Sequence, residues 1–216
     1  MQKHVAIVNF TGFRNNWGCQ ATSFELMKFM AACFPAKTDL RFSLIPLLSH
    51  CAMDLQLQDR LDEVYAAFTA VATAAPDAGQ GLRLLEEICL RRYGPFADKV
   101  KAADVVVFQA EGAMGLGADF ARGPRLMLLP FVAKHAWNKT VISLNQSFYA
   151  QDARVIRNAV ESFGSFDFTA FREGASAALA RASGLTHAAY VPDLAFETRA
   201  VADPSGSRAP RYFAVS

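Results

Sequence analysis

Apolar and polar positions along this chain fall into short blocks, and the block lengths predict strands separated by helices. Six short, solidly apolar runs rich in β-branched and aromatic residues predict strands over residues 5–10, 42–47, 104–108, 140–144, 167–171 and 188–191. A strand that is covered on both faces has no polar side, so its pattern is a continuous apolar run rather than an alternation. These runs therefore indicate a parallel sheet with helices on both of its faces.

Between the runs, apolar residues recur every three or four positions, which is the spacing of a helix. This spacing predicts helices over residues 23–34, 54–75, 82–90, 152–163 and 174–182. Pro76 and Gly79 separate the second and third of them, and we expect these two to form a helical pair packed on the sheet. Alternation of strands and helices predicts an α/β fold with a doubly wound parallel sheet, that is, a Rossmann-like domain.

The last sixteen residues differ from the rest of the chain. Residues 201–210 are polar and contain proline, glycine and serine, whereas residues 211–216 begin like a new strand. We therefore expect residues 1–200 to form a Rossmann-like N-terminal domain. Residues 201–216 would be a linker and the first strand of a truncated second domain, although a strand that pairs on the sheet edge is the alternative.

Composition and charge exclude several classes of protein. Hydrophobic residues make up 52% of the chain, which is enough for a core, and the net charge is only +2, so we predict no nucleic-acid partner. The four cysteines are scattered without metal-ligand spacing, which predicts free thiols and no metal site. The apolar run near the N-terminus is too short for a signal peptide and no run approaches the ~20 residues of a membrane span, so we predict a cytoplasmic protein without a membrane span.

Candidate chemistry follows the strands, because ligands of open parallel sheets bind beyond the carboxyl ends of the strands. The loop after the first strand contains Arg14, Asn15, Asn16 and Gly18 ahead of a helix. A helix N-terminus and an arginine suit an anion, but a simple turn and helix cap explain the same residues.

Three further strand ends carry polar side chains. Glu111 and Gly112 follow the third strand, where Glu111 is a candidate base or a helix cap. Asn145, Gln146 and Ser147 follow the fourth, and they suit a carbohydrate, a carboxylate or an ordinary turn. Arg172 stands at a helix N-terminus, where a cation is electrostatically unfavourable, so we expect either an anionic ligand or a carboxylate such as Asp193 beside it.

Taken together, these motifs resemble the polysaccharide pyruvyl transferase family. The resemblance covers about residues 5–196 and rests on the segments NNWGCQA (15–21), DVVVFQAEG (104–112), SLNQSF (143–148), FDFTAFREGAS (166–176) and VPDLAF (191–196). The arginine-glutamate-x-x-serine motif together with the proline-aspartate-x-alanine-phenylalanine motif is the most specific part. One departure is Ala110, because the family often has glycine at that position.

The resemblance implies a two-domain enzyme similar to GT-B glycosyltransferases, of which this chain matches the N-terminal domain. Such enzymes transfer a pyruvyl group from phosphoenolpyruvate to a sugar or glycan acceptor in exopolysaccharide biosynthesis, with no metal or organic cofactor, and a homo-oligomer is possible. The cleft residues that the resemblance implies are Asn15, Asn16, Gly18, Glu111, Gly112, Asn145, Gln146, Arg172 and Asp193.

In that family, a histidine and arginines for the donor lie in the second domain, so we expect the chain alone to fold without catalysing. Two alternatives stay open. One is a GT-B-like glycosyltransferase that uses a nucleotide sugar, and the other is a non-catalytic sugar-binding module.

Overall fold

Six strands form one parallel sheet in a computed structural model that describes residues 1–48, 59–112 and 122–197. The sheet has the order β2-β1-β3-β4-β5-β6, and every neighbouring pair is parallel. The strands are β1 (Gln2–Phe10), β2 (Asp39–Pro46), β3 (Val105–Phe108), β4 (Thr140–Gln146), β5 (Phe168–Phe171) and β6 (Ala189–Tyr190). The predicted α/β fold with a doubly wound, Rossmann-like parallel sheet is confirmed.

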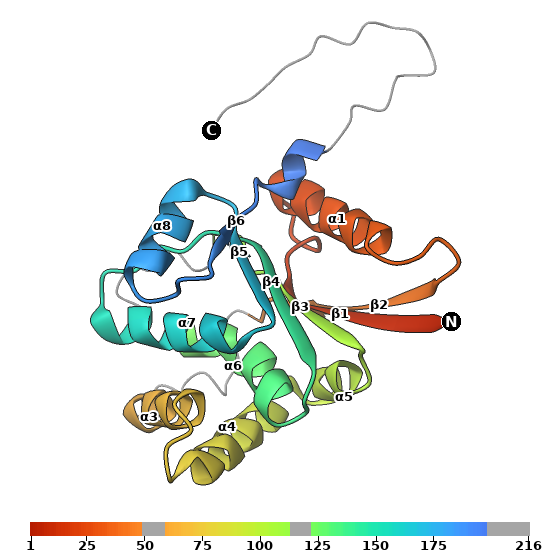
Figure 1. Cartoon of the computed structure of the whole chain (residues 1–216). Coiled ribbons are helices and arrows are strands. Elements are labelled where there is room, and N and C mark those ends of the chain that lie inside the picture. The colour runs from red at the N-terminus through yellow and green to blue at the C-terminus, as the bar shows by residue number, and fades with distance from the viewer. Residues whose placement is uncertain (49–58, 113–121, 198–216) are drawn as a thin grey trace, which may run out of the picture.

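Helices cover the two faces of the sheet unequally (Figure 1). One face carries α1 (Trp17–Ala32) and the short 3-10 helix η2 (Leu194–Glu197). The other carries α5 (Pro95–Lys101), α6 (Arg122–His135), α7 (Ala153–Ser165) and α8 (Gly174–Ala182), with α3 (Leu61–Ala72) and α4 (Ala78–Tyr93) outside them.

Strand order explains this division. Connections between parallel strands are right-handed, so a helix that leads toward β2 lies on the opposite face from helices that lead toward β6. The chain leaves β1 in the first direction and β3 in the second. The neighbouring carboxyl ends of β1 and β3 therefore form the topological switch point of the sheet, where folds of this type bind their ligands.

Successive side chains of the central strands point alternately to the two faces of the sheet. Val5 and Ile7 pack with Leu26 of α1, whereas Ala6 and Val8 pack with the helices of the other face, and all four strand residues are fully buried. Burial on both sides is the reason that β1 appears in the sequence as an unbroken apolar run.

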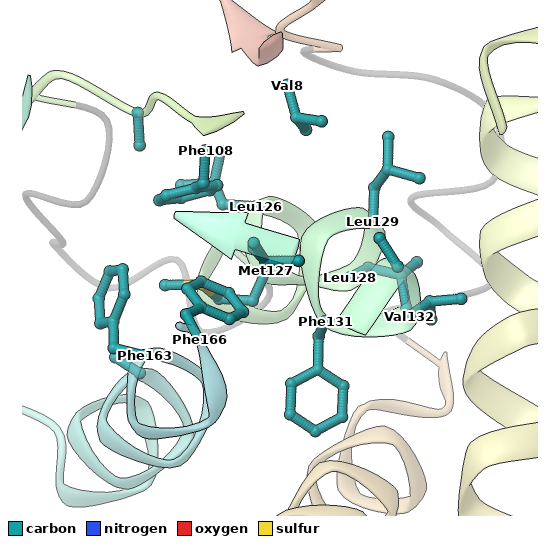
Figure 2. Packing of buried hydrophobic residues seen from close by; sticks show 14 of the residues in the cluster. Val8, Phe108, Leu126, Met127, Leu128, Leu129, Phe131, Val132, Phe163 and Phe166 are labelled. Atoms are coloured by element: carbon teal, nitrogen blue, oxygen red, sulfur yellow. The ribbon is translucent and has the colours of Figure 1, made fainter. Parts of the chain in front are cut away.

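Helix α6 was absent from the sequence-based prediction, and its surroundings explain why. Leu126, Met127, Leu128, Leu129 and Phe131 are five successive apolar side chains, interrupted only by Pro130, and each is at most 5% exposed. Figure 2 shows the labelled side chains of α6 projecting on several sides of the helix. A helix buried all round has no polar face, so the periodicity that reveals an amphipathic helix is missing.

Other boundaries also differ from the prediction. Helix α1 starts at Trp17 rather than at residue 23, because the Asn16 side chain accepts a hydrogen bond from the backbone of Cys19 at 3.1 Å and caps the helix. The predicted pair α3 and α4 packs mainly against α7 and α6 rather than directly on the sheet. The expected linker and strand over residues 201–216 lie outside the described residues. None of the described helices is long and apolar enough to cross a membrane.

Candidate functional site

The backbone turns sharply at the carboxyl ends of β1, β3 and β4. Asn9, Glu111 and Asn145 have φ values of 61°, 47° and 62°, in the left-handed region that non-glycine residues seldom adopt. Asn9 and Asn145 lie where the strand registers shift, and both side chains are buried. The two other described non-glycine residues with positive φ, Ala74 and Asn138, lie away from this edge. Backbone strain of this kind needs support from surrounding contacts and is often found at functional sites.

The first group of polar residues lies at the switch point and is here called the closed network: Thr11, Ser23, Gln109 and Glu111. The Gln109 amide donates to Ser23 Oγ at 2.9 Å, to Glu111 Oε1 at 3.2 Å and to Thr11 Oγ1 at 3.4 Å. Thr11 also hydrogen-bonds to Ser23 at 3.0 Å and donates to Glu111 Oε1. All four side chains are buried, with Glu111 8% exposed, so the network holds one carboxylate largely away from water.

The loop between β1 and α1 covers this network closely. Gly12 is required there, because a Cβ atom at that position would lie 2.6 Å from the Phe10 ring and 3.0 Å from Ser23 Cβ. The thiol of Cys19, in the first turn of α1, also interacts with the Glu111 carboxylate. Burial, followed by a hydrogen bond to Glu111 and its negative charge, raises the pKa of Cys19 from 9.0 to about 11 despite the opposing charge of Arg14.

The second group is here called the open network: Ser147, Arg172, Glu173 and Asp193. Arg172 Nη1 binds Asp193 Oδ2 at 3.0 Å, and Arg172 Nε donates to Ser147 Oγ and Glu173 Oε1, each at 3.0 Å. Arg172 and Asp193 side chains are each 21% exposed. The cation at the start of α8 is therefore balanced by carboxylates, which is one of the two outcomes that the sequence predicted.

Glu173 is held in its charged form. Burial alone would raise the pKa of this carboxyl, but hydrogen bonds from Ser147 and Ser176 and the charge of Arg172 together lower it. Ser176 Oγ in turn accepts the backbone N–H of Phe148 at 2.9 Å, which ties α8 to the loop after β4.

The two networks meet through backbone and through α1. Ser147 N donates to Glu111 O at 2.8 Å, and Glu111 forms a parallel bridge with Gln146. On α1, Thr22 donates to Asp193 at 3.2 Å, while its neighbour Ser23 belongs to the closed network. A Cβ atom at Gly112 would lie 3.7 Å from Arg172 Nη2, so the backbone that follows Glu111 comes within contact distance of the arginine.

The predicted site residues thus have different places. The structure brings Glu111, Gly112, Ser147, Arg172 and Asp193 together. Arg14, Asn15, Asn16 and Gly18 lie on the loop and first turn beside the closed network; Arg14 and Asn15 are exposed, and Asn16 serves as the helix cap.

The side chains of Asn145 and Gln146 do not reach solvent. Asn145 Oδ1 accepts the Leu194 N–H at 3.0 Å, and Gln146 Nε2 donates to Ser143 and to Ala170 O. Both are buried, so their contacts support the loop rather than face the edge. The departure from the family pattern, Ala110, is fully buried in the core below the loop, so its methyl group does not narrow the edge.

Sequence reasoning missed Thr11, Thr22, Ser23 and Gln109 as members of the site. Thr11 and Gln109 directly follow strands, so the rule that located Glu111 was sufficient to find them. Thr22 and Ser23 lie inside a helix and carry no comparable signal.

The structure shows no cluster of three or more histidine, cysteine or acidic side chains suited to a metal within the described ranges. Cys19, Cys33 and Cys89 are free thiols, and Cys51 lies outside the described residues.

Comparison with known proteins identifies one family. A family model described as polysaccharide pyruvyl transferase matches residues 11–214, which is most of the chain. The matched region includes both networks. No curated protein and no solved structure shows a significant match.

Proposed function

This chain belongs to the polysaccharide pyruvyl transferase family, and we propose that it takes part in moving a pyruvyl group from phosphoenolpyruvate to hydroxyl groups of a glycan. The observation that supports the proposal is that a buried carboxylate, Glu111, and an arginine held by carboxylates, Arg172, lie at the same carboxyl edge of the sheet. This edge includes the switch point, where α/β folds bind ligands.

The reaction that we propose is ketal formation. One acceptor hydroxyl adds to C2 of phosphoenolpyruvate while C3 gains a proton and becomes a methyl group. The second hydroxyl then adds to C2, the C2–O bond to phosphate breaks, and inorganic phosphate leaves with the remaining proton. The acceptor needs a group that accepts hydroxyl protons, and the donor needs positive charge near its phosphate and carboxylate.

In this proposal Glu111 is the base or hydrogen-bond acceptor for the sugar. Thr11 and Gln109 both donate to Oε1, which orients the carboxylate. Arg172, with Arg14 on the neighbouring loop, supplies positive charge, while Asp193 and Ser147 hold the guanidinium in place. Asn15, Asn16 and Gly18 would add contacts from the loop.

We further propose that these residues form the acceptor side of the reaction, in the cytoplasm, and that groups beyond those described here complete the donor side. Arg14 and Arg172 balance only part of the charge of a trianionic donor. The described histidines do not supply the missing proton donor. His4 binds Ser43 on β2 at 2.9 Å, His135 lies at the far end of α6, and His187 precedes β6 and so lies at the opposite edge of the sheet.

The test has two arms. Saturation-transfer NMR of the purified chain with galactose- and mannose-containing oligosaccharides should detect weak binding that Glu111→Gln and Asp193→Asn reduce. Phosphate release from phosphoenolpyruvate plus the same oligosaccharides should stay at the background rate. Asp152→Asn, at a helix cap outside both networks, is the matched control.

Two results would contradict the proposal. Release that depends on the chain and is lost in Glu111→Gln would contradict the division between acceptor and donor sides, because these residues would then suffice for catalysis. Binding of a nucleotide sugar in place of the oligosaccharides would favour a glycosyltransferase instead.

A further inference from the structure

Exposed aromatic side chains are concentrated around α1. Of the eight exposed aromatic side chains in the described ranges, five belong to α1, to the loop before it or to η2, and they are here called the aromatic surface: Phe13, Trp17, Phe24, Phe29 and Phe196. Figure 1 shows α1 on the face of the sheet opposite the larger helical layer, and η2 contacts α1 there. Single exposed apolar residues are ordinary, but a group of them marks a surface that binds a protein or a membrane.

The outer side of α1 is apolar where a polar side is expected. Trp17, Phe24 and Lys28 follow one another at steps of seven and four residues, so they lie on one side of the helix. Leu26 and Met30 are buried on the opposite side, against the sheet. A helix packed on a sheet usually presents charged and polar side chains to water, whereas Trp17 is 73% exposed and Phe24 is 51% exposed.

A groove extends the aromatic surface from α1 to η2. It has a volume of about 420 Å³ and lies between the two helices. Phe29 of α1 and Phe196 of η2 both line it, and the Phe196 side chain is 84% exposed. Lys28 belongs both to this groove and to the line of Trp17 and Phe24, so the two parts of the aromatic surface adjoin.

Exposed charges on this part of the chain are positive. From residue 11 to residue 38 the cations are Arg14, Lys28 and Lys37, all exposed, and the single acid, Glu25, is 8% exposed. Glu25 accepts a hydrogen bond from Lys28 Nζ at 2.7 Å and offsets only one of the three cations. Asp193, which lines the groove, is paired within the open network. A net positive charge therefore accompanies the exposed aromatic rings.

Aromatic rings combined with cations match a membrane surface better than a protein partner. Tryptophan and phenylalanine side chains enter the headgroup region of a bilayer, where lysine and arginine attract anionic headgroups. Protein interfaces are depleted in lysine, yet Lys28 lies where the two parts of the aromatic surface adjoin.

We propose that the aromatic surface binds a bilayer that contains anionic lipids, with the outer side of α1 facing the headgroups. The binding is peripheral, because side chains rather than a membrane-spanning helix enter the lipid. It does not rest on the proposed transfer reaction, since the aromatic surface shares no residue with the closed or the open network.

Vesicle flotation tests the proposal on the purified chain. The probes are vesicles of phosphatidylcholine with and without about 30% phosphatidylglycerol. We expect the chain to float with the anionic vesicles and to dissociate as the salt concentration rises, because salt screens the headgroup charge. Trp17→Ala and Phe24→Ala should each weaken binding about tenfold, since each removes a side chain that lipid would bury.

Cation variants and matched controls complete the flotation experiment. Lys28→Gln and Lys37→Gln should each weaken binding about fivefold. The controls are Phe168→Ala, which removes an exposed aromatic side chain at the start of β5, and Arg91→Gln, which removes an exposed cation of α4. Both should bind as the wild type does.

Trp17 also provides a direct spectroscopic measurement. The chain has two tryptophans, and the other, Trp137, is partly buried and donates from Nε1 to Glu86 at 2.7 Å. In Trp137→Phe the tryptophan emission comes from Trp17 alone. Anionic vesicles should shift this emission to shorter wavelength, because the indole moves from water into an apolar environment.

Three outcomes would overturn the proposal. One is the absence of flotation with anionic vesicles at low salt, and another is flotation that both Trp17→Ala and Phe24→Ala leave unchanged. The third is a dimer in sedimentation velocity that these two substitutions dissociate, which would assign the aromatic surface to a second copy of the chain.

Discussion

The closed and the open network lie at the same edge of the sheet but differ in the burial of their charged groups and in the partners of those groups. The closed network places one carboxylate, Glu111, among neutral donors and shields it from water. The open network surrounds Arg172 with two carboxylates at the surface, where each group keeps part of its hydration. A buried charge depends on each of its few donors, whereas an exposed pair does not. The closed network should therefore contribute more to stability than the open network does.

The largest effect is expected for Gln109→Leu. Loss of the amide removes one of the two hydrogen bonds to Glu111 Oε1 and one to Ser23, so a buried carboxylate is left short of donors. The free energy of unfolding, measured by urea denaturation, should fall by about 3 kcal/mol. The same substitution at the exposed Gln151 should change it by less than about 0.5 kcal/mol. Equal losses in the free energy of unfolding for Gln109→Leu and Gln151→Leu would show that the closed network does not stabilise the fold.

Arg172→Ala should lower stability less and binding more. Its ion pair with Asp193 is partly exposed, so we expect a loss of about 1 to 2 kcal/mol in the free energy of unfolding. Oligosaccharide binding should weaken, because Ser147 and Asp193 lose the guanidinium that positions them. Arg60→Ala, which breaks the exposed pair with Glu63, is the control for a surface arginine and should cost no more than about 0.5 kcal/mol. A loss as large as that of Gln109→Leu would make Arg172 a structural residue.

The reactivity of Cys19 is a measure of the closed network, because the thiol lies beside Glu111. Because burial and Glu111 raise the pKa of this thiol to about 11, its thiolate form is scarce at mildly alkaline pH. Alkylation by iodoacetamide, followed by mass spectrometry, should be about tenfold slower than for a thiol with the ordinary pKa. Glu111→Gln removes the negative charge, lowers the pKa of Cys19 and should speed alkylation. An unchanged rate would mean that the carboxylate does not act on the thiol.

The smallest effect concerns acid stability. The pKa of Glu173 is lowered, so its contribution is present above its ordinary value of 4.5 and is lost as pH falls through the lower folded value. The side chain is 45% exposed, and after screening by solvent we expect less than about 0.5 kcal/mol. Urea titrations of wild type and Glu173→Gln should converge below that pH and differ slightly above it. If the free energies of unfolding of the two proteins instead differed more at acidic pH, the pKa of Glu173 would be raised rather than lowered.

What the sequence determined by itself was the sheet and the edge that carries the chemistry. Apolar runs such as 5–10 and 140–144 favour strands buried on both faces, because they are short, rich in β-branched residues and contain few polar residues to offer to water. Once the strands were assigned as parallel, the polar residues that follow them had to meet at one edge. This is why Glu111, Ser147, Arg172 and Asp193 were found from pattern alone.

Only the tertiary structure decided what each of those residues does. Helix α6 lacks a polar stripe, so its helical form depends on neighbours that bury every side of it. Adjacent residues also differ in role. Gln146 donates to Ser143 inside the sheet, whereas Ser147 accepts from Arg172, because successive side chains of an extended segment point to opposite sides. The partners of Glu111 include Thr11, a hundred residues away, and no local pattern encodes which long-range donor will meet a buried carboxylate.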